Sequence, residues 1–130
     1  MSEGDLSKLI QLEALKYKCK LMRNNAGSMT DKTGRVVRYG LGNVSKKLWD
    51  NWKSSDLIGY TQVVITPDMV GRTVAVFTAV EVKLPSSPKD VRYKAQEKFI
   101  QQVQADGGIG SIIKSVDELK EMFKDFFTQD

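Results

Sequence analysis

The chain of 130 residues contains no histidine and a single cysteine, Cys19. Without histidine it can form neither a Cys/His zinc site nor a histidine-based catalytic triad, and one cysteine cannot close an internal disulfide. No apolar run approaches the roughly 20 residues of a membrane span. These absences exclude several classes of enzyme and leave oxygen ligands as the only way to hold a metal ion.

The overall composition is that of an ordinary globular protein, with 41% apolar and 28% charged residues. The length predicts one domain, residues 1–130. The first residues are acidic and polar where a secretory signal would be basic and then apolar, so we expect a cytoplasmic protein without membrane contact. The net charge of +4 is compatible with a polyanionic partner but is also the plain outcome for many soluble proteins.

Hydrophobic periodicity and turn residues predict an alternation of helices and strands. Helices are expected at residues 6–20 (capped by Asp5), 91–106 and 116–127, and strands at 35–40, 56–65, 74–83 and 109–113. Residues 31–34 form a turn that predicts a hairpin, and residues 44–54 fit a loop or one short helix. The helix between the last two strands implies a crossover, so we expect an α/β fold with one mixed sheet and helices on both faces.

The inward faces of the last two helices follow from the same spacing. We expect these apolar residues to face the core: Phe99, Ile100 and Val103, then Val116, Leu119, Met122, Phe123, Phe126 and Phe127. Ser115 and Glu118 fit a capping box before the last helix.

The strand at residues 74–83 is the most informative segment. Its first seven residues, 74–80, are apolar except Thr78, which predicts a strand covered on both faces. Near its end, Glu81 and Lys83 lie two residues apart, so their side chains should share one face. Functional groups gather at the carboxyl ends of strands in open α/β sheets, which makes this end a candidate site.

A second carboxylate, Asp56, stands at the start of the preceding apolar strand. Carboxylates and a lysine in reach of one another suit metal-assisted phosphodiester hydrolysis, because Mg²⁺ takes carboxylates, backbone carbonyls such as that of Val82, and water. Lys83 would then stabilise developing charge or orient the attacking water.

The amide side chain of Gln96 falls on the apolar face of its helix and should point toward the sheet. Each of these residues also has an ordinary structural interpretation. Glu81 and Lys83 can form an ion pair without function, Asp56 can be a turn residue, and Gln96 can hydrogen-bond a backbone group.

Several motifs occur in a fixed order along the chain. They are Arg23-Asn24-Asn25-Ala26-Gly27, Gly40-Leu41-Gly42, Ser55-Asp56-Leu57-Ile58-Gly59, Thr66-Pro67-Asp68-Met69-Val70-Gly71-Arg72, Glu81-Val82-Lys83, Gln96 with Phe99, Gly107-Gly108 and Ser115-Val116-Asp117-Glu118-Leu119. Together they resemble the VRR-NUC family, the virus-type replication-repair nucleases of the PD-(D/E)XK superfamily. The resemblance covers about residues 3–120 and implies the restriction-endonuclease-like core, αβββαβ with an added C-terminal helix.

The resemblance also implies roles for the candidate residues. Asp56 and Glu81 would be metal-ligating carboxylates, Val82 would give its carbonyl, Lys83 would be the catalytic lysine, and Gln96 the helix glutamine of the motif. The cofactor would be Mg²⁺ or Mn²⁺, with no small-molecule cofactor.

Members of the family tend to add a glutamate from the first helix. Here Glu3 is favoured over Glu13, because its distance from the Arg23 motif is closer to the family pattern. Residues 43–53 form an insert relative to that pattern and would be a lid, a DNA contact or a dimer contact, unless Trp49 and Trp52 only fill a hydrophobic gap.

Stand-alone phage and prophage members resemble Holliday junction resolvases and are expected to be homodimers. The expected partner is therefore branched or four-way-junction DNA, in the cytoplasm of a bacterial or phage-infected cell. Candidate phosphate contacts are Lys46, Lys47, Lys53, Arg35, Arg38, Lys89, Arg92 and Lys94, each of which can equally be a solvated surface charge. The rival expectation is a non-catalytic DNA-binding or assembly module that retains the fold.

Overall fold

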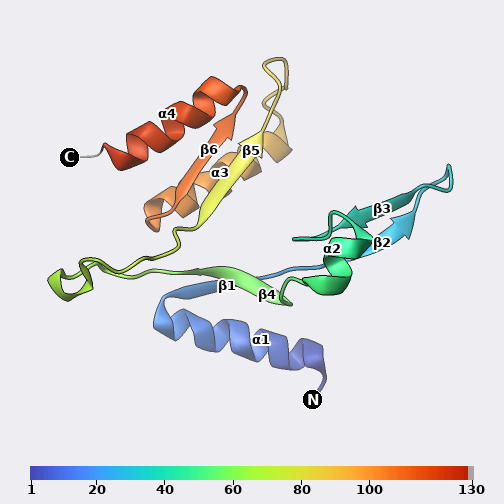
Figure 1. Ribbon diagram of the computed structural model, residues 1–130, viewed down its shortest axis with the longest axis horizontal. Helices are drawn as coiled ribbons and strands as arrows, with labels where there is room; N and C mark the ends of the chain where they lie inside the picture. Colours follow the sequence, from blue (N-terminus) through green and yellow to red (C-terminus); the bar gives the residue numbers. More distant parts are fainter. Residues whose placement is uncertain (129–130) are drawn as a thin grey trace. The chain divides into compact units, whose positions relative to one another are not determined.

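The computed structural model describes residues 1–128 and is mixed α/β (Figure 1). Contacts among residues divide the chain into two compact units, residues 1–61 and residues 62 onward. Each unit has its own helices and its own paired strands. None of the helices in residues 1–128 combines the length and the apolar character that crossing a bilayer requires.

The first unit begins with helix α1 (Glu3–Ala14), followed by the short 3₁₀ helix η1 (Leu15–Tyr17). Ser2 caps α1 by accepting the Asp5 backbone N–H, and the Asp5 carboxylate accepts the Ser2 N–H in return. The predictions that Asp5 is the cap and that the helix reaches residue 20 are therefore wrong. The helix stops early because Lys18 takes a left-handed conformation, φ 58°.

Strands β1 (Cys19–Arg23) and β4 (Leu57–Thr61) pair antiparallel, with Leu21 opposite Gly59. A Cβ at residue 59 would overlap the backbone carbonyl of Lys20, so this close approach of the two strands requires glycine. The helix α1 contacts β1, and the Gln11 side chain donates to the Leu21 carbonyl. In Figure 1, α1 lies along this strand pair.

The hairpin predicted around residues 31–34 is confirmed by strands β2 (Gly27–Thr30) and β3 (Val36–Tyr39). The Asp31 carboxylate accepts hydrogen bonds from Thr33 and from the Arg35 backbone, which fixes the turn. Residues 46–51 form the short helix α2 (Lys46–Asn51), capped by Ser45. The turn between β3 and α2 contains Asn43. Its amide oxygen accepts from Arg38, and its amide nitrogen donates to the Gly27 and Tyr39 carbonyls.

The second unit contains η2 (Pro67–Met69), β5 (Thr78–Val82), α3 (Val91–Ala105), β6 (Ile109–Ile113) and α4 (Val116–Phe127). Strands β5 and β6 are parallel, with α3 as the crossover between them, as predicted (Figure 1). Asp90 caps α3 and Ser115 caps α4, each through a hydrogen bond to the backbone three residues on.

Helices α3 and α4 cover opposite faces of this strand pair. Ile109 and Ile113 of β6 form a buried cluster with Met122 of α4, while Gly110, on the alternate face, lies against Ile100 of α3. The predicted arrangement of helices on both faces is thus confirmed for the second unit.

Several predicted boundaries are wrong. The strand expected at residues 74–83 contains only Thr78–Val82, because its pairing with β6 ends where β6 begins, at the bond from Ile109 N–H to the Phe77 carbonyl. It is not covered on both faces either, since Val80 and Val82 are 41% and 75% exposed. The strand expected at residues 56–65 ends at Thr61, and residues 63–65 are exposed.

The predicted single mixed sheet is also absent from the described residues, which contain three two-stranded sheets: β1 with β4, β2 with β3, and β5 with β6. Four predicted core residues are exposed: Phe99 by 44%, Val116 by 69%, Phe123 by 37% and Phe127 by 75%. The helical turns place Tyr93, Ile100 and Val103 of α3 inward, and Phe99 is rotated away from that face. In α4 the residues that contact the core cluster are Leu119, Met122 and Phe126.

Candidate active site

Glu81 and Lys83 lie on the same face of β5, as the two-residue spacing predicts. The Lys83 Nζ is 3.6 Å from Glu81 Oε1, and the two side chains are only 18% and 32% exposed. This face is the one that α3 covers, since Ala79, in the same alternation, pairs with Gly110 against Ile100. A partly buried carboxylate and a partly buried ammonium therefore share one space beside α3.

The backbone around this pair is held by β6. Phe77 accepts from Ile109, and the Lys83 N–H donates to the Ile113 carbonyl over 3.0 Å, one residue beyond the end of β5. Because alternate residues of a strand direct their backbone groups to the same side, the Val82 carbonyl points toward the edge away from β6. This carbonyl is thus directed away from the parallel ladder, as a ligand to an ion would require.

Tyr93 of α3 completes the wall beside Lys83. Its side chain is 4% exposed, and its ring centroid lies 5.5 Å from Lys83 Nζ and 5.6 Å from Lys89 Nζ. Both distances are in the range of cation–π attraction. Sequence reasoning missed Tyr93, although its spacing from Gln96, Ile100 and Val103 places it on the same helical face.

Gln96 and Glu81 line one pocket of about 410 Å³ between β5 and α3. Arg92, Phe99 and Ile100 contribute to the same wall. The Oε1 atom of Gln96 is buried and finds no hydrogen-bond donor among residues 1–128. A buried amide oxygen without a donor is uncommon and suggests a missing partner in this pocket.

Asp56 belongs to the first unit, where it directly precedes β4 and is exposed. Its backbone carbonyl accepts from the Asn24 N–H, and the Asn24 side chain donates to Ser54 Oγ and to the Ser55 carbonyl. Asn24 therefore fixes the chain at Asp56 and at the two residues before it, a structural role that sequence reasoning did not assign.

The two candidate glutamates lie at opposite ends of α1. Glu3 is its first residue, whereas Glu13 lies in the last turn and pairs with Lys16 over 2.8 Å. The bond from Gln11 to Leu21 shows that α1 runs antiparallel to β1, so the start of α1 lies toward Arg23 and its partner Leu57 (Figure 1). Glu3 therefore lies toward the end of the strand pair where Asp56 stands, and Glu13 toward the other end.

The candidate phosphate contacts fall into two groups. Three have partners within the first unit: Lys46 pairs with Asp50 over 2.7 Å, Lys53 lies over the Trp49 ring, and Arg38 donates to Asn43. The hydrogen bond from Lys46 lowers the pKa of Asp50, with smaller contributions from nearby cations. The others, Arg35, Lys47, Lys89, Arg92 and Lys94, are exposed, as are Lys46 and Lys53 of the first group.

The insert at residues 43–53 is partly structural. Asn43 is 4% exposed and donates to the Gly27 and Tyr39 carbonyls, and the Trp52 ring lies against Gly42. Trp52 is nevertheless 59% exposed, so it covers Gly42 without being enclosed itself. The predicted roles as a lid, a DNA contact or a dimer contact stay predictions.

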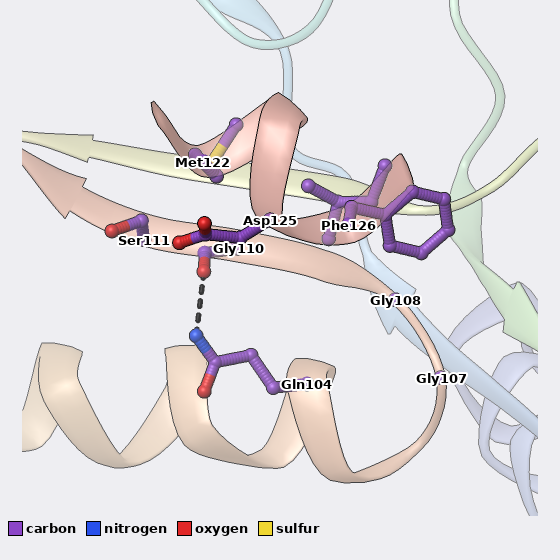
Figure 2. Close-up of a pocket in the computed structure, with 9 residues that line it drawn as sticks. Gln104, Gly107, Gly108, Gly110, Ser111, Met122, Asp125 and Phe126 are labelled. Carbon is purple, nitrogen blue, oxygen red and sulfur yellow. Dashed lines mark hydrogen bonds between the residues drawn. The ribbon is translucent and has the colours of Figure 1, made fainter. Parts of the chain in front are cut away.

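A second hollow, of about 350 Å³, lies at the outer edge of β6. Figure 2 shows Gln104 reaching from α3 to the Gly110 carbonyl on one side of β6, and Met122, Asp125 and Phe126 of α4 on the other. None of the predicted site residues lines it. The Gln104 bond satisfies a carbonyl at a strand edge that would otherwise face water.

Within either unit, the described residues include no group of three acidic or cysteine side chains placed to hold a metal ion. In the second unit the available donors are the Glu81 carboxylate, the Val82 carbonyl and the unpaired Gln96 Oε1. All are hard oxygen donors, which suits Mg²⁺ or Mn²⁺ and does not suit softer, sulfur-seeking ions.

Comparison of the chain with protein-family models, with curated protein sequences and with solved structures gave no match in any of the three. The similarity of its motifs to the VRR-NUC family therefore stays a prediction.

Proposed function

We propose that this protein is a Mg²⁺- or Mn²⁺-dependent endonuclease of the PD-(D/E)XK type that hydrolyses phosphodiesters in branched DNA. The observation that carries the proposal is the convergence of three predicted residues on one face of the second unit. Glu81 and Lys83 stand 3.6 Å apart, and Gln96, whose buried Oε1 has no donor among residues 1–128, lines the same pocket as Glu81.

The residues divide the chemistry among them. Lys83, oriented by Glu81 and by the Tyr93 ring, places a positive charge where negative charge develops on a phosphate during hydrolysis. Glu81 and the Val82 carbonyl would hold the cation, with Gln96 of the same unit adding an amide oxygen. For Asp56 and Glu3, which belong to the first unit, the ligand role implied by the motif resemblance stays a prediction. A bound divalent cation supplies polarisation of the phosphate and a lowered pKa of water.

The substrate class and assembly follow from the motif resemblance and from symmetry. A four-way junction offers two symmetry-related strands, so a homodimer with one site per subunit can make both incisions. Substrate choice would then come from backbone shape and charge, through the exposed cations named above.

The test is cleavage of a labelled four-way junction, a flap and a plain duplex, with Mg²⁺, with Mn²⁺ and with EDTA. The wild type should cut junctions only with a divalent ion. Lys83→Ala should lower the rate at least about 100-fold, because it removes the charge nearest the reacting phosphate. Lys120→Ala is the matched control, since Lys120 is exposed on α4 and only pairs loosely with Asp117.

Equal cutting by Lys83→Ala and wild type would remove the proposed mechanism, and duplex cut as fast as junctions would remove the proposed substrate. DNA binding without cleavage, unchanged by Glu81→Gln, would instead support the non-catalytic binding module. A light-scattering mass near the 14.6 kDa of one chain would contradict the homodimer.

A further inference from the structure

Two ammonium groups share one aromatic ring at the start of α3. Lys83 Nζ and Lys89 Nζ lie 5.5 Å and 5.6 Å from the centroid of the Tyr93 ring, so they are no farther apart than the sum of these distances. Tyr93 is buried, and its backbone N–H is bonded to the Asp90 carboxylate over 2.9 Å. The ring is therefore a fixed support for two cationic side chains.

A third cation, Arg92, lies in the neighbouring pocket. It precedes Tyr93 in α3 and lines the pocket of Glu81 and Gln96. Among the described residues, two carboxylates contact this group. Glu81 pairs with Lys83, and Asp90 accepts the backbone N–H of Tyr93. The three cations therefore outnumber these two carboxylates.

We propose that Lys89, supported by Tyr93, and Arg92, in the pocket of Glu81, form a binding subsite for a backbone phosphate of nucleic acid next to the one that Lys83 faces. This inference rests on the proposed function for the assignment of Lys83. A Lys ammonium acts on phosphate as a point charge, and an Arg guanidinium adds a planar pair of donors, so the two together suit phosphate oxygens.

The Tyr93 ring explains why the cations stay in place before the phosphate arrives. Two like charges near one another repel, but the negative π face of the ring attracts each of them. An incoming phosphate would replace mutual repulsion with attraction to both. Lys89 is placed for this by the turn before it, where Ser87 is bonded twice to Leu84.

The experiment measures binding, not cleavage. Fluorescence anisotropy of a labelled four-way junction in EDTA, over a range of salt concentrations, gives the slope of log affinity against log salt. Lys89→Gln and Arg92→Gln should each weaken binding several-fold and reduce the slope by about 1, the expectation for one lost phosphate contact. Lys120→Gln, on α4, should leave the slope unchanged.

The role of the ring is tested separately. Tyr93→Phe keeps the aromatic face and should keep the wild-type slope, whereas Tyr93→Leu should reduce it. Circular dichroism checks that both variants fold. If Tyr93→Leu does not fold, the Lys89 and Arg92 variants alone decide the proposal.

Unchanged slopes for both Lys89→Gln and Arg92→Gln, or no measurable binding by the wild type, would overturn the subsite. The outcome is separable from the proposed function. If the wild type cuts junctions but neither variant changes the slope, only the subsite is contradicted. If the wild type never cuts but both variants reduce the slope, the nuclease activity is contradicted and the phosphate subsite is supported.

Discussion

The two units of this chain are stabilised in different ways. In the described residues, the buried apolar side chains all belong to the second unit: Tyr93, Ile100, Val103, Ile109, Ile113 and Met122. The first unit contains one buried residue, and it is the polar Asn43. The second unit is thus organised by burial of apolar surface, and the first by hydrogen bonds of turns and caps.

This difference explains why the candidate site residues are partly buried in the second unit and exposed in the first. The buried apolar residues of α3 and β6 can hold Glu81 and Gln96 in one pocket, with Lys83 partly buried beside Glu81. Asp56 in the first unit is fixed through its backbone by Asn24 but keeps its carboxyl exposed. Side-chain geometry is therefore more strongly determined in the second unit.

The largest expected effect comes from removing apolar contact in the second unit. Ile113→Ala should lower the free energy of unfolding by about 2–5 kcal/mol, because Ile113 is 5% exposed within the cluster of Ile109 and Met122. Leu12→Ala in α1, where Leu12 is 64% exposed, should change it by less than about 0.5 kcal/mol. Urea unfolding measures both, and similar losses would contradict the contrast between the units.

A smaller effect is expected from Asn43. Asn43→Ala removes the donors to the Gly27 and Tyr39 carbonyls and the acceptor for Arg38, and should cost about 1–3 kcal/mol. Hydrogen exchange should then speed up in β2 and β3 and stay unchanged in β5 and β6. Asn51→Ala, which removes one exposed bond to Lys47, is the control, and equal loss of protection in all strands would contradict the prediction.

The smallest effect concerns pH and the hairpin turn. Hydrogen bonds from the Thr33 hydroxyl, and then from the Arg35 backbone, lower the pKa of Asp31 below its ordinary value of 3.8. Because the folded pKa is the lower one, this stabilisation is complete above pH 3.8 and is lost as the pH falls through the folded pKa.

An NMR titration of Asp31 should therefore give a midpoint below 3.8. In Thr33→Val the midpoint should move back up, since the largest cause of the shift is removed. A wild-type midpoint at or above 3.8, or no change in the variant, would show that the turn is looser than described.

Elements with strong local signals were predictable from the sequence. Helices α3 and α4 lie within one residue of their expected bounds, because caps at Asp90 and Ser115 and the Gly107 turn mark their ends. Strand β1 was missed, since Cys19–Arg23 has little β-branched content and the helical spacing continues into it. The break at Lys18, a left-handed non-glycine residue, has no sequence signature.

Apolar content alone misled where no hydrogen-bonding partner was available. Residues 74–77 and 63–65 are rich in valine, yet they lie outside the strands because a strand also needs a neighbour to bond. Long-range pairing of this kind is a property of the whole fold, so a single segment cannot reveal it.

The candidate site was predictable to the extent that it depends on periodicity. The alternation of a strand placed Glu81 and Lys83 together, and the turn of a helix pointed Gln96 inward. The support of Lys83 by Tyr93 was not predicted, because it depends on how α3 crosses β5. The role of Asn24 beside Asp56 likewise depends on contacts between segments 30 residues apart.

The hydrogen bond from Lys83 to Ile113 has a consequence for how such a chain can change over evolution. This bond holds the Glu81–Lys83 pair to β6, before the loop of residues 84–90. Lys89 lies in that loop, and Arg92 and Tyr93 lie in the first turn of α3. Insertions or deletions between Pro85 and Pro88 would alter the spacing of cations and leave the pair in place. Loop length alone would thus change the distance from Lys89 to the Glu81–Lys83 pair without altering the pair itself.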